Sequence, residues 1–465
     1  VLAAGDSKRM KSKQSKVLHK IAGRSVIENL LASVKPLSPK NLTVVVGANK
    51  DEVIEHLGEI APEVKTVFQE KRDGTGGATQ LALAEHKGDG TVLILAGDTP
   101  LLTNQTLSEF IQVHDDRKNI ASVLTALQPD PTGYGRVIRS SDDEILKIVE
   151  EKDATESEKE IDEINTGVYL FDLAVLREVI KNLKNDNAQK ELYLTDVISL
   201  INSSGKKSHA ILSNDYSETL GINDRTQLAE CAAIMRDRIN SHHMLNGVTI
   251  LDPTTTWIDH DVKIESDVLI YPGSSITGAS NIKSEAVIGP RTTLNSCVVE
   301  EGAKVVESNC TESVIGKGAK VGPFTYLRKG SVLKNESKAG SFVEIKNSTV
   351  GKGSKVAHLS YVGDAEIGDE TNIGAATVFV NYDGENKHKT KVGDHVRIGS
   401  DTMLVAPVSV GDGAYTAAGS VINEDVPAGA IGIGRARQVN ILGWVLKKRK
   451  DSKSAAAAKK AGAKE

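Results

Sequence analysis

Two segments in the first quarter of the chain carry residues that could together hold a nucleotide. The opening stretch VLAAGDSKRMKSKQSK places a short loop after an apolar run and supplies Arg9 and Lys16 as cations. Backbone N–H groups of such a loop, with Arg and Lys side chains, are common ligands of phosphate. Asp98 ends the run TVLILAGD. Mg²⁺ needs only one or two protein ligands because it keeps most of its waters. These residues indicate a site for phosphate and magnesium.

Each of these features also has a purely structural explanation. The basic loop holds a single glycine, Gly5, lacks the GxxxxGK[ST] spacing of a Walker loop, and could be the solvent-facing start of a helix. Asp98 could cap the helix that follows it. The chemical interpretation is favoured because the two segments occur together.

A second group of polar residues lies in the last third of the chain. An isolated His is more often structural than catalytic, but His358 lies in AHLSYVG among other polar groups. In that setting His358 is a candidate functional residue. The polar groups around it in the sequence are Arg328, Lys346, Tyr361, Asn372 and Lys387.

The elements of the first half have the pattern of an α/β domain. The runs TVVVG (43–47), TVLILAGD (91–98) and ASVLTAL (121–127) predict buried strands, and the segments between them have helical spacing. We expect a largely parallel, Rossmann-like sheet over residues 1–222, with ligands beyond the carboxyl ends of its strands. A long linker helix is predicted over residues 223–247, because Asn223 or Asp224 could cap it and Asn246-Gly247 could end it.

The second half has a six-residue period, which predicts a parallel β-helix over residues 248–446. Three six-residue sides close one triangular coil, with an aliphatic residue pointing inward from each side. The period breaks at VFVNYDGENKHK, which we interpret as a loop extruded from the coil, where functional groups tend to lie. The aliphatic positions are Ile258, Ile264, Ile270, Ile276, Ile282, Ile288, Leu294, then Ile315, Val321, Leu327, Leu333, then Val350, Val356, Val362, and finally Val392, Ile398, Leu404 and Val410.

Composition excludes several classes of protein. The chain of 465 residues has 39% hydrophobic and 26% charged residues, which is ordinary for a globular protein. A net charge of −5 gives no general attraction to nucleic acid. The absence of an 18-residue apolar run argues against a membrane span, and three cysteines without a CxxC pair favour a reducing compartment, so we expect a cytoplasmic protein. The Lys/Ala-rich residues 447–465 are expected to be a solvated tail.

Ordered motifs along nearly the whole chain resemble one bacterial family. In the first half these are LAAG with Arg9-Met10 and KVLH, then QEKRDGTGGA, AGDTPLL, PTGYGR, IVEEKDA, EINTG and GINDR. In the second half they are GPFTYLR, FVEIK, AHLSYVGDAEIG, TNIGA, VNYDGENK, LVAPVSVG, AAGS and RARQ. The chain is therefore similar to the bifunctional N-acetylglucosamine-1-phosphate uridylyltransferases/glucosamine-1-phosphate acetyltransferases.

For residues 1–222 this resemblance implies a magnesium-dependent uridylyltransferase that takes UTP and N-acetylglucosamine 1-phosphate. By position in the family's motifs, Asp98 and Asn223 would bind Mg²⁺, and Arg9 and Lys16 would face the triphosphate. The remaining nucleotide and sugar residues would be Leu2, Ala3, Ala4, Gly5, Gln69, Gly74, Thr75, Gly97, Gly135, Glu150 and Asn165.

For the second half the resemblance implies an acetyltransferase with a left-handed coil, which assembles as a homotrimer. His358 would be the general base, with Glu344 as its orienting partner. Arg328 and Lys346, helped by Tyr361, Asn372 and Lys387, would bind the sugar phosphate. Acetyl-CoA would lie along Ala375, Asn381, Tyr382, Ser400, Ala418 and Arg435. The product, UDP-N-acetylglucosamine, would supply cell-wall synthesis.

Several positions depart from the family's pattern. Ser7 and Lys8 replace a Gly and a Thr of the phosphate loop, and Ser15 replaces a Pro, so we predict weakened uridylyl transfer. Other departures are Gly77, Lys190, Leu192, Ser341 and Ala376. Two alternatives remain open: a pyrophosphorylase with one activity, and a non-catalytic scaffold. The chemistry-bearing residues present in both halves argue against each of them.

Overall fold

The structure, a computed structural model, describes residues 1–5, 8–140 and 144–464. It forms two compact units, one of residues 1–263 with 275–279, the other of residues 264–274 with 280–465. Among the described residues no helix is long and apolar enough to cross a membrane.

The first unit is an α/β domain, as its sequence predicts. Its parallel strands β1, β4 and β5 form one sheet, and a bridge from Leu2 to Ala96 continues that sheet toward β6. Strand β10 runs antiparallel to both β6 and β7, so the sheet is mixed at this point, while β11 runs parallel to β7. The strands are β1 (Leu2–Ala3), β4 (Thr43–Val46), β5 (Lys65–Phe68), β6 (Thr91–Ile94), β7 (Ala121–Leu127), β8 (Gly135–Arg139), β9 (Ile145–Val149), β10 (Glu163–Asp172) and β11 (Ser208–Leu212).

Helices pack on this sheet through their apolar residues. Helix α1 begins at a capping box, in which the Ser25 hydroxyl accepts from Glu28 N–H and the Glu28 carboxylate accepts from Ser25 N–H. Its buried side chains Ile27 and Leu31 join Val44 and Val46 of β4 in one core cluster. The helices of this domain are α1 (Val26–Val34), α2 (Lys50–Ile60), α3 (Gly74–Ala84), α4 (Asn104–Asp116), α5 (Glu156–Lys159), α6 (Leu173–Val179) and α7 (Asp196–Ser203). Short elements are the 3-10 turns at Lys8–Met10 and Lys16–Leu18 and the hairpin of β2 (Lys20–Ile21) and β3 (Arg24–Ser25).

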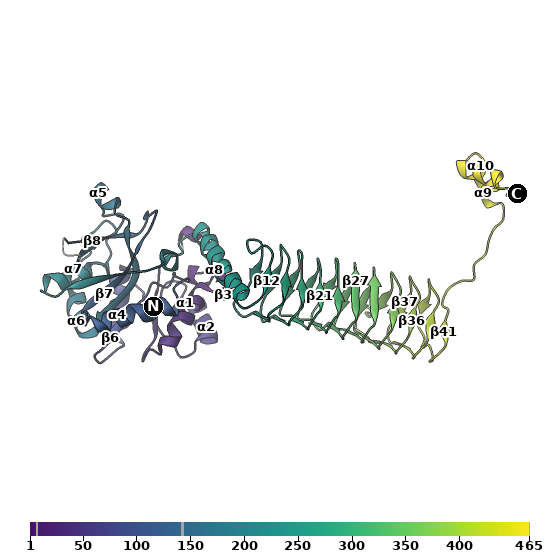
Figure 1. The fold of residues 1–465 in the computed structure, drawn as a ribbon, viewed down its shortest axis with the longest axis horizontal. Coiled ribbons are helices and arrows are strands. Elements are labelled where there is room, and N and C mark those ends of the chain that lie inside the picture. Colours follow the sequence, from purple (N-terminus) through teal and green to yellow (C-terminus); the bar gives the residue numbers. More distant parts are fainter. Residues whose placement is uncertain (6–7, 141–143, 465) are drawn as a thin grey trace. The chain divides into compact units, whose positions relative to one another are not determined.

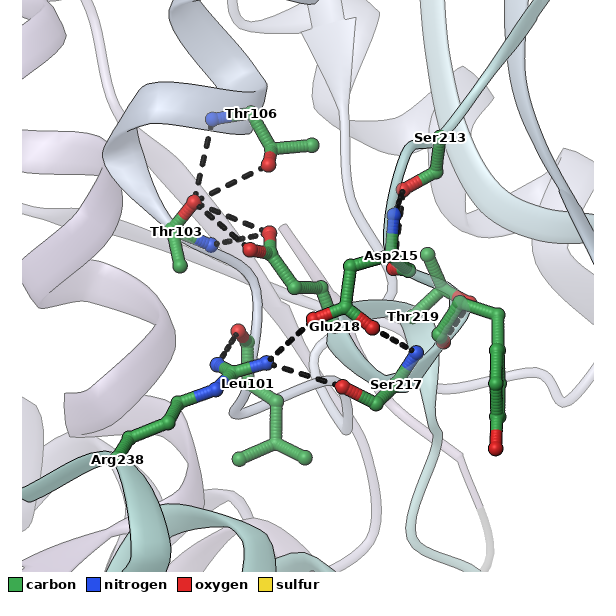
Figure 2. Close-up of polar contacts among 10 residues, drawn as sticks. Leu101, Thr103, Thr106, Ser213, Asp215, Ser217, Glu218, Thr219 and Arg238 are labelled. Atoms are coloured by element: carbon green, nitrogen blue, oxygen red, sulfur yellow. Dashed lines mark hydrogen bonds and ion pairs between the residues drawn. The ribbon is translucent and has the colours of Figure 1, made fainter. Parts of the chain in front are cut away.

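The predicted linker helix is α8 (Arg225–Leu245), and Asp224 caps it by accepting from Thr226 N–H and Gln227 N–H. Arg238 of α8 donates to the Leu101 carbonyl at 2.6 Å and to the Ser217 hydroxyl at 3.3 Å (Figure 2). Next to this contact, Glu218 accepts from the hydroxyl and the N–H of Thr103, the N-cap of α4 (Figure 2). The loop after Asp98 is therefore held between α4 and α8. Strands β12 (Thr249–Ile250), β13 (Trp257–Ile258) and β16 (Ser275–Thr277) also belong to the first unit.

The second unit is a parallel β-helix of stacked coils (Figure 1). Its strands form three parallel columns, an arrangement consistent with a left-handed β-helix. The aliphatic residues of the six-residue period lie inside: in this unit every one from Ile270 to Val410 is at most 3% exposed.

The columns have these members. The first comprises β15 (Leu269–Ile270), β18 (Val287–Ile288), β21 (Lys304–Val305), β24 (Lys320–Val321), β27 (Lys338–Ser341), β30 (Lys355–His358), β33 (Asn372–Ile373), β36 (Arg397–Ile398), β39 (Tyr415–Thr416) and β41 (Ile431–Gly432). The second comprises β19 (Thr293–Asn295), β22 (Asn309–Thr311), β25 (Tyr326–Leu327), β28 (Glu344–Lys346), β31 (Tyr361–Gly363), β34 (Val378–Val380), β37 (Met403–Val405) and β40 (Val421–Ile422). The third comprises β17 (Asn281–Ile282), β20 (Val298–Val299), β23 (Val314–Ile315), β26 (Val332–Leu333), β29 (Thr349–Val350), β32 (Ala365–Ile367), β35 (Thr390–Val392) and β38 (Val408–Val410).

The Lys/Ala-rich end of the chain is helical. Ser452 caps α10 (Lys453–Lys460), whose run of alanines has high helix propensity. Ala455 of α10 and Leu446 of α9 (Trp444–Lys448) are buried, whereas most of the lysines are exposed. The segment expected to be a solvated tail thus has regular structure, and its charged side chains remain in solvent.

Candidate functional site

A cavity of about 480 Å³ opens in the first unit, where β1, β5 and β6 end. The loop residue Gly5 follows β1, Gln69 follows β5 and Asp98 follows β6. These residues lie near one another because parallel strands end at the same edge of a sheet. The cavity gathers most of the predicted nucleotide and sugar residues: Leu2, Ala3, Ala4, Gly5, Lys16, Gln69, Gly74, Thr75, Asp98, Glu150 and Asn165.

Lys16 lies at the centre of the predicted magnesium site. Its ammonium group forms an ion pair with the Asp98 carboxylate and donates to the Asn223 amide oxygen at 3.3 Å. Asn223 is positioned by the start of α8, since its N–H donates to Gln227. The two oxygens thus already surround one cation, and hard oxygen donors suit Mg²⁺. Among the described residues no group of three or more His, Cys, Asp or Glu side chains could hold a metal ion.

Glu150 and Glu191 add two carboxylates to the lining of the cavity. Glu150 accepts from the Thr195 hydroxyl at 3.1 Å, and burial, followed by the charges of Asp196, Asp153 and Glu191, raises its pKa. Gly135 pairs with Asn165 in the sheet, and a Cβ at Gly135 would lie 3.6 Å from Glu150. This group of residues has the carboxylate and amide oxygens that recognise hydroxyl groups.

Four predicted residues do not line the cavity, namely Arg9, Gly97, Gly135 and Asn223. Arg9 is exposed and lines neither this cavity nor its neighbour. Gly97 has a backbone role, because its N–H donates to the Leu2 carbonyl at 2.9 Å. Ser7 lies outside the described residues.

Sequence reasoning missed several residues around this cavity. A neighbouring cavity of about 430 Å³ is lined by Lys8, Lys11, Lys13 and Arg72, and both cavities share Lys8 and Arg72. Four cations beside a short loop are a signal of anion binding that the sequence offered in KRMKSK and EKRD. Lys8, one of the departures from the family's pattern, therefore adds positive charge to the site.

In the second unit, a cluster of cations lies on the second column of strands. Arg328 forms an ion pair with Glu344 at 3.0 Å, and Lys346 forms one with Asp364 at 3.3 Å. The neighbouring ammonium of Lys346 lowers the pKa of Lys387, so two cations lie side by side. The Asp364 carboxylate cannot neutralise both Lys346 and Lys387. Positive charge is therefore left for an anionic ligand.

Asp364 organises this cluster, and sequence reasoning missed it. It accepts from Asn347 at 2.7 Å, from Asn381 at 2.5 Å and from Lys346. Although burial raises the pKa of Asp364, these donors lower it below its ordinary value. Its position in VGDAEIG, at a corner of the coil, was the available signal.

His358 ends β30, in the first column, and its side chain is exposed. Ser360 and Ala376 donate to its backbone carbonyl, which holds the backbone at this corner. Among the described residues Glu344 pairs with Arg328, and no hydrogen bond joins Glu344 to His358. The described residues of one chain therefore do not show the pairing of Glu344 with His358 that the resemblance implies.

The other predicted residues of the second site lie in or next to strands of the first and second columns. The Tyr361 hydroxyl and the Asn381 amide converge over Gly363, where an added Cβ would lie within 3.0 Å of each. Asn372 lies in β33, one strand beyond β30 in the first column.

The residues predicted for acetyl-CoA follow an edge of the same coils. The Ala375 carbonyl accepts from Asp401 N–H, next to Ser400, and a Cβ at Gly399 would meet Ala418 N. Arg435 approaches Gly419 in the same way, so four of these residues lie on successive coils: Ala375, Ser400, Ala418 and Arg435. Tyr382, which is exposed, starts the extruded loop, where it bridges to Lys387.

Comparisons with known proteins match a transferase family in each half of the chain. Residues 1–159 match the family of MobA-like NTP transferase domains, and residues 389–424 match the bacterial transferase hexapeptide family (six repeats). Over 461 residues the chain is 49% identical to the Bifunctional protein GlmU of Streptomyces coelicolor, covering 98% of this chain and 96% of that protein. It is also 49% identical to the proteins of the same name from Mycolicibacterium gilvum, covering 98% and 93%, and Corynebacterium glutamicum strain R, covering 99% and 96%.

Proposed function

Because the chain belongs to the family of the bifunctional GlmU proteins, we propose that it catalyses two successive steps of UDP-N-acetylglucosamine synthesis. The second unit transfers an acetyl group from acetyl-CoA to glucosamine 1-phosphate. The first unit then joins N-acetylglucosamine 1-phosphate to the uridylyl group of UTP. The observation that carries the proposal is a pair of separate cationic clusters, one in each unit, each beside residues suited to one of these reactions.

In the acetyl transfer, the amine of glucosamine 1-phosphate attacks the thioester carbon. His358 accepts the proton of the amine as the new amide bond forms, and the thiol of coenzyme A leaves. Arg328, Lys346 and Lys387 bind the sugar phosphate, because a dianion matches the excess positive charge beside Asp364. The edge that carries Ala375, Ser400 and Ala418 receives acetyl-CoA.

In the uridylyl transfer, a phosphate oxygen of N-acetylglucosamine 1-phosphate attacks the α-phosphate of UTP. A new phosphorus–oxygen bond forms, and the bond to the leaving pyrophosphate breaks. Asp98 and Asn223 would hold Mg²⁺, which when bound supplies positive charge against the phosphate oxygens. Lys16 contributes a further positive charge, and Glu150 and Asn165 orient the sugar through its hydroxyl groups. The protein accelerates this reaction mainly by positioning and by charge neutralisation.

The assembly and place of action are part of the proposal. The chain acts as a homotrimer in the cytoplasm, and a neighbouring subunit completes the acetyl-transfer site. This arrangement would supply the missing partner of His358, whose ring has no hydrogen bond among the described residues of one chain.

A paired assay tests the two activities. Thiol release from acetyl-CoA with glucosamine 1-phosphate, and pyrophosphate release from UTP with N-acetylglucosamine 1-phosphate and magnesium, should both occur. If only one of the two products is released, a single-activity pyrophosphorylase or acetyltransferase would be favoured. If neither thiol nor pyrophosphate is released, a non-catalytic scaffold would be favoured.

Single substitutions test the independence of the two sites. Asp98→Ala should lower uridylyl transfer by at least about a hundredfold and leave acetyl transfer unchanged, because it removes a charged ligand from the first site only. His358→Ala should have the converse effect, by a similar factor, through loss of the general base. Loss of both activities from either substitution would refute independent sites.

A further inference from the structure

The side-chain amide of Gln69 has a fixed orientation in the first cavity. Gln69 is 7% exposed, and its Nε2 lies 2.8 Å from Asp73 Oδ1 and 3.0 Å from the Gly74 carbonyl oxygen. Both neighbours are acceptors, so the amide atom between them must be the NH₂ group, which donates both of its hydrogens. The opposite orientation would place three oxygens against one another. The remaining amide atom, Oε1, is therefore presented as an acceptor.

The amide oxygen lies beside donors that belong to the backbone. Gln69, Gly74 and Thr75 line the same cavity, and Gly74 and Thr75 are the first two residues of α3. The first N–H groups of a helix have no acceptor within the helix. An acceptor from Gln69 next to donors from α3 matches the edge of uracil, which presents its N3–H beside its O4. Cytosine presents the reverse pattern, an acceptor at N3 beside an amine donor.

Asp73 occupies space that a side chain at position 77 would fill. A Cβ at Gly77 would lie within 3.0 Å of both the carboxylate carbon and the carboxylate oxygens of Asp73. The backbone of Asp73 is held as well, because Leu192 N–H donates to its carbonyl at 2.7 Å and Gly76 N–H donates to the Leu192 carbonyl at 2.8 Å. Gly77 and Leu192, which depart from the family's pattern, thus surround the residue that orients Gln69.

We propose that Asp73 is a positioning residue that fixes the Gln69 amide as an acceptor and thereby selects a pyrimidine nucleotide with an N3–H, uracil or thymine, over cytosine. The absence of a side chain at Gly77 leaves the space that the Asp73 carboxylate occupies. The inference rests on the proposed function, since it takes this cavity as the site of the nucleoside triphosphate. Asp73 does not line the cavity, so it acts through Gln69 and not by contact with the base.

The test compares UTP with CTP in the pyrophosphate-release assay. In the full chain, Asp73→Ala should lower the UTP/CTP ratio of kcat/KM by about tenfold, mainly through a higher KM for UTP, because the Gln69 amide loses one of the two acceptors that fix its orientation. Asp73→Asn should keep the ratio, since its amide oxygen still accepts from Gln69. The matched control is Glu70→Ala, which removes an exposed carboxylate from the same loop and should also keep the ratio.

A double-substitution cycle isolates the role of Gly77. Gly77→Ala should lower the ratio in the wild-type background, where the new methyl displaces Asp73, and should have no further effect in Asp73→Ala. Circular dichroism and the inactivation temperature of uridylyl transfer report, for each variant, that the first unit is folded. A wild-type chain that uses neither nucleotide would overturn the proposed function and this inference with it. A wild-type chain that uses UTP, with an unchanged ratio in a folded Asp73→Ala variant, would overturn the role of Asp73 alone.

Discussion

In both units a carboxylate with little exposure holds a lysine in place. Lys16 and Asp98 have side-chain exposures of 11% and 19%, and Lys346 and Asp364 have 19% and 10%. Ion pairs at such depth are screened less by solvent and salt than surface pairs are. Each pair therefore restricts the position of a lysine ammonium group.

His260 gives the first unit a dependence on pH that does not involve either site. Burial, followed by the charge of Arg24, lowers its pKa to about 4, and its Nε2 is buried without a hydrogen-bond partner among the described residues. Between pH 6.5 and 4 the unfolded chain binds a proton that the folded chain excludes, so this contribution to stability is lost as the pH falls. The loss from this residue should be about 1–2 kcal/mol between pH 7 and pH 5.

Urea unfolding at a series of pH values checks this prediction. His260→Gln cannot take up the proton, so the free energy of unfolding of the variant should fall less steeply below pH 6.5. The exposed neighbour His242 provides the control, as His242→Gln should leave the slope unchanged. Parallel curves for His260→Gln and the wild type would contradict the assignment.

The residues of the first site differ in how far the sequence could predict them. Lys16, Asp98 and Gln69 lie at the ends of predicted strands or in ordered motifs, and the structure brings them to one cavity. Asp73 could not be predicted, because its role depends on the empty space at Gly77, which only the packing of α3 reveals. Asp364 was missed for a similar reason: its donors come from separate coils.

Among the elements, α8 and the loop after Asp98 depend on each other. The ends of α8 were predictable to within two residues because Asp224 caps its start and Asn246-Gly247 follows its end. Its docking was not predictable, since Arg238 reaches the Leu101 carbonyl across 137 positions of sequence. The direction of β10 was also beyond the sequence pattern, because hydrophobic periodicity marks a strand without giving its partner or its orientation.

Arg238→Met tests whether this docking stabilises the first unit. The substitution keeps much of the apolar stem but removes the donors to Leu101 and Ser217 and the ion pair to Asp215, so the first unit should lose about 1–3 kcal/mol of stability (Figure 2). Thermal inactivation of uridylyl transfer should occur at a lower temperature, while acetyl transfer should keep its wild-type inactivation temperature. Ser241→Ala, an exposed change on the same helix, is the control. Equal inactivation of uridylyl transfer in the wild type and Arg238→Met would exclude a stabilising role for this contact.

For the whole molecule, the six-residue period predicted the inside of the β-helix and left its outside undetermined. Inward positions repeat because every coil must fill the same triangular core, and burial confirms all of them except Ile264, which is half-buried. Outward positions carry no such constraint. Several of them hold large apolar side chains, among them Phe324 and Phe342, which are 55% and 60% exposed. Their rings stack with centroids 5.2 Å apart, and both backbones have positive φ, which is uncommon for a bulky residue.

The exposed phenylalanine pair leads to a prediction about assembly. Two stacked aromatic rings in solvent are costly for a monomer, and an apolar patch of this kind is typical of an interface between subunits. Phe342→Glu places a charge in that patch, so it should shift the proposed trimer toward monomers in light scattering coupled to size-exclusion chromatography. If a neighbouring subunit completes the acetyl-transfer site, thiol release should fall by at least about tenfold in parallel, while pyrophosphate release stays within about twofold of the wild type. Lys334→Glu reverses a charge elsewhere on the coil and should alter neither the mass nor the activities. A Phe342→Glu chain that remains trimeric, or that becomes monomeric with full acetyl transfer, would contradict a shared site at this face.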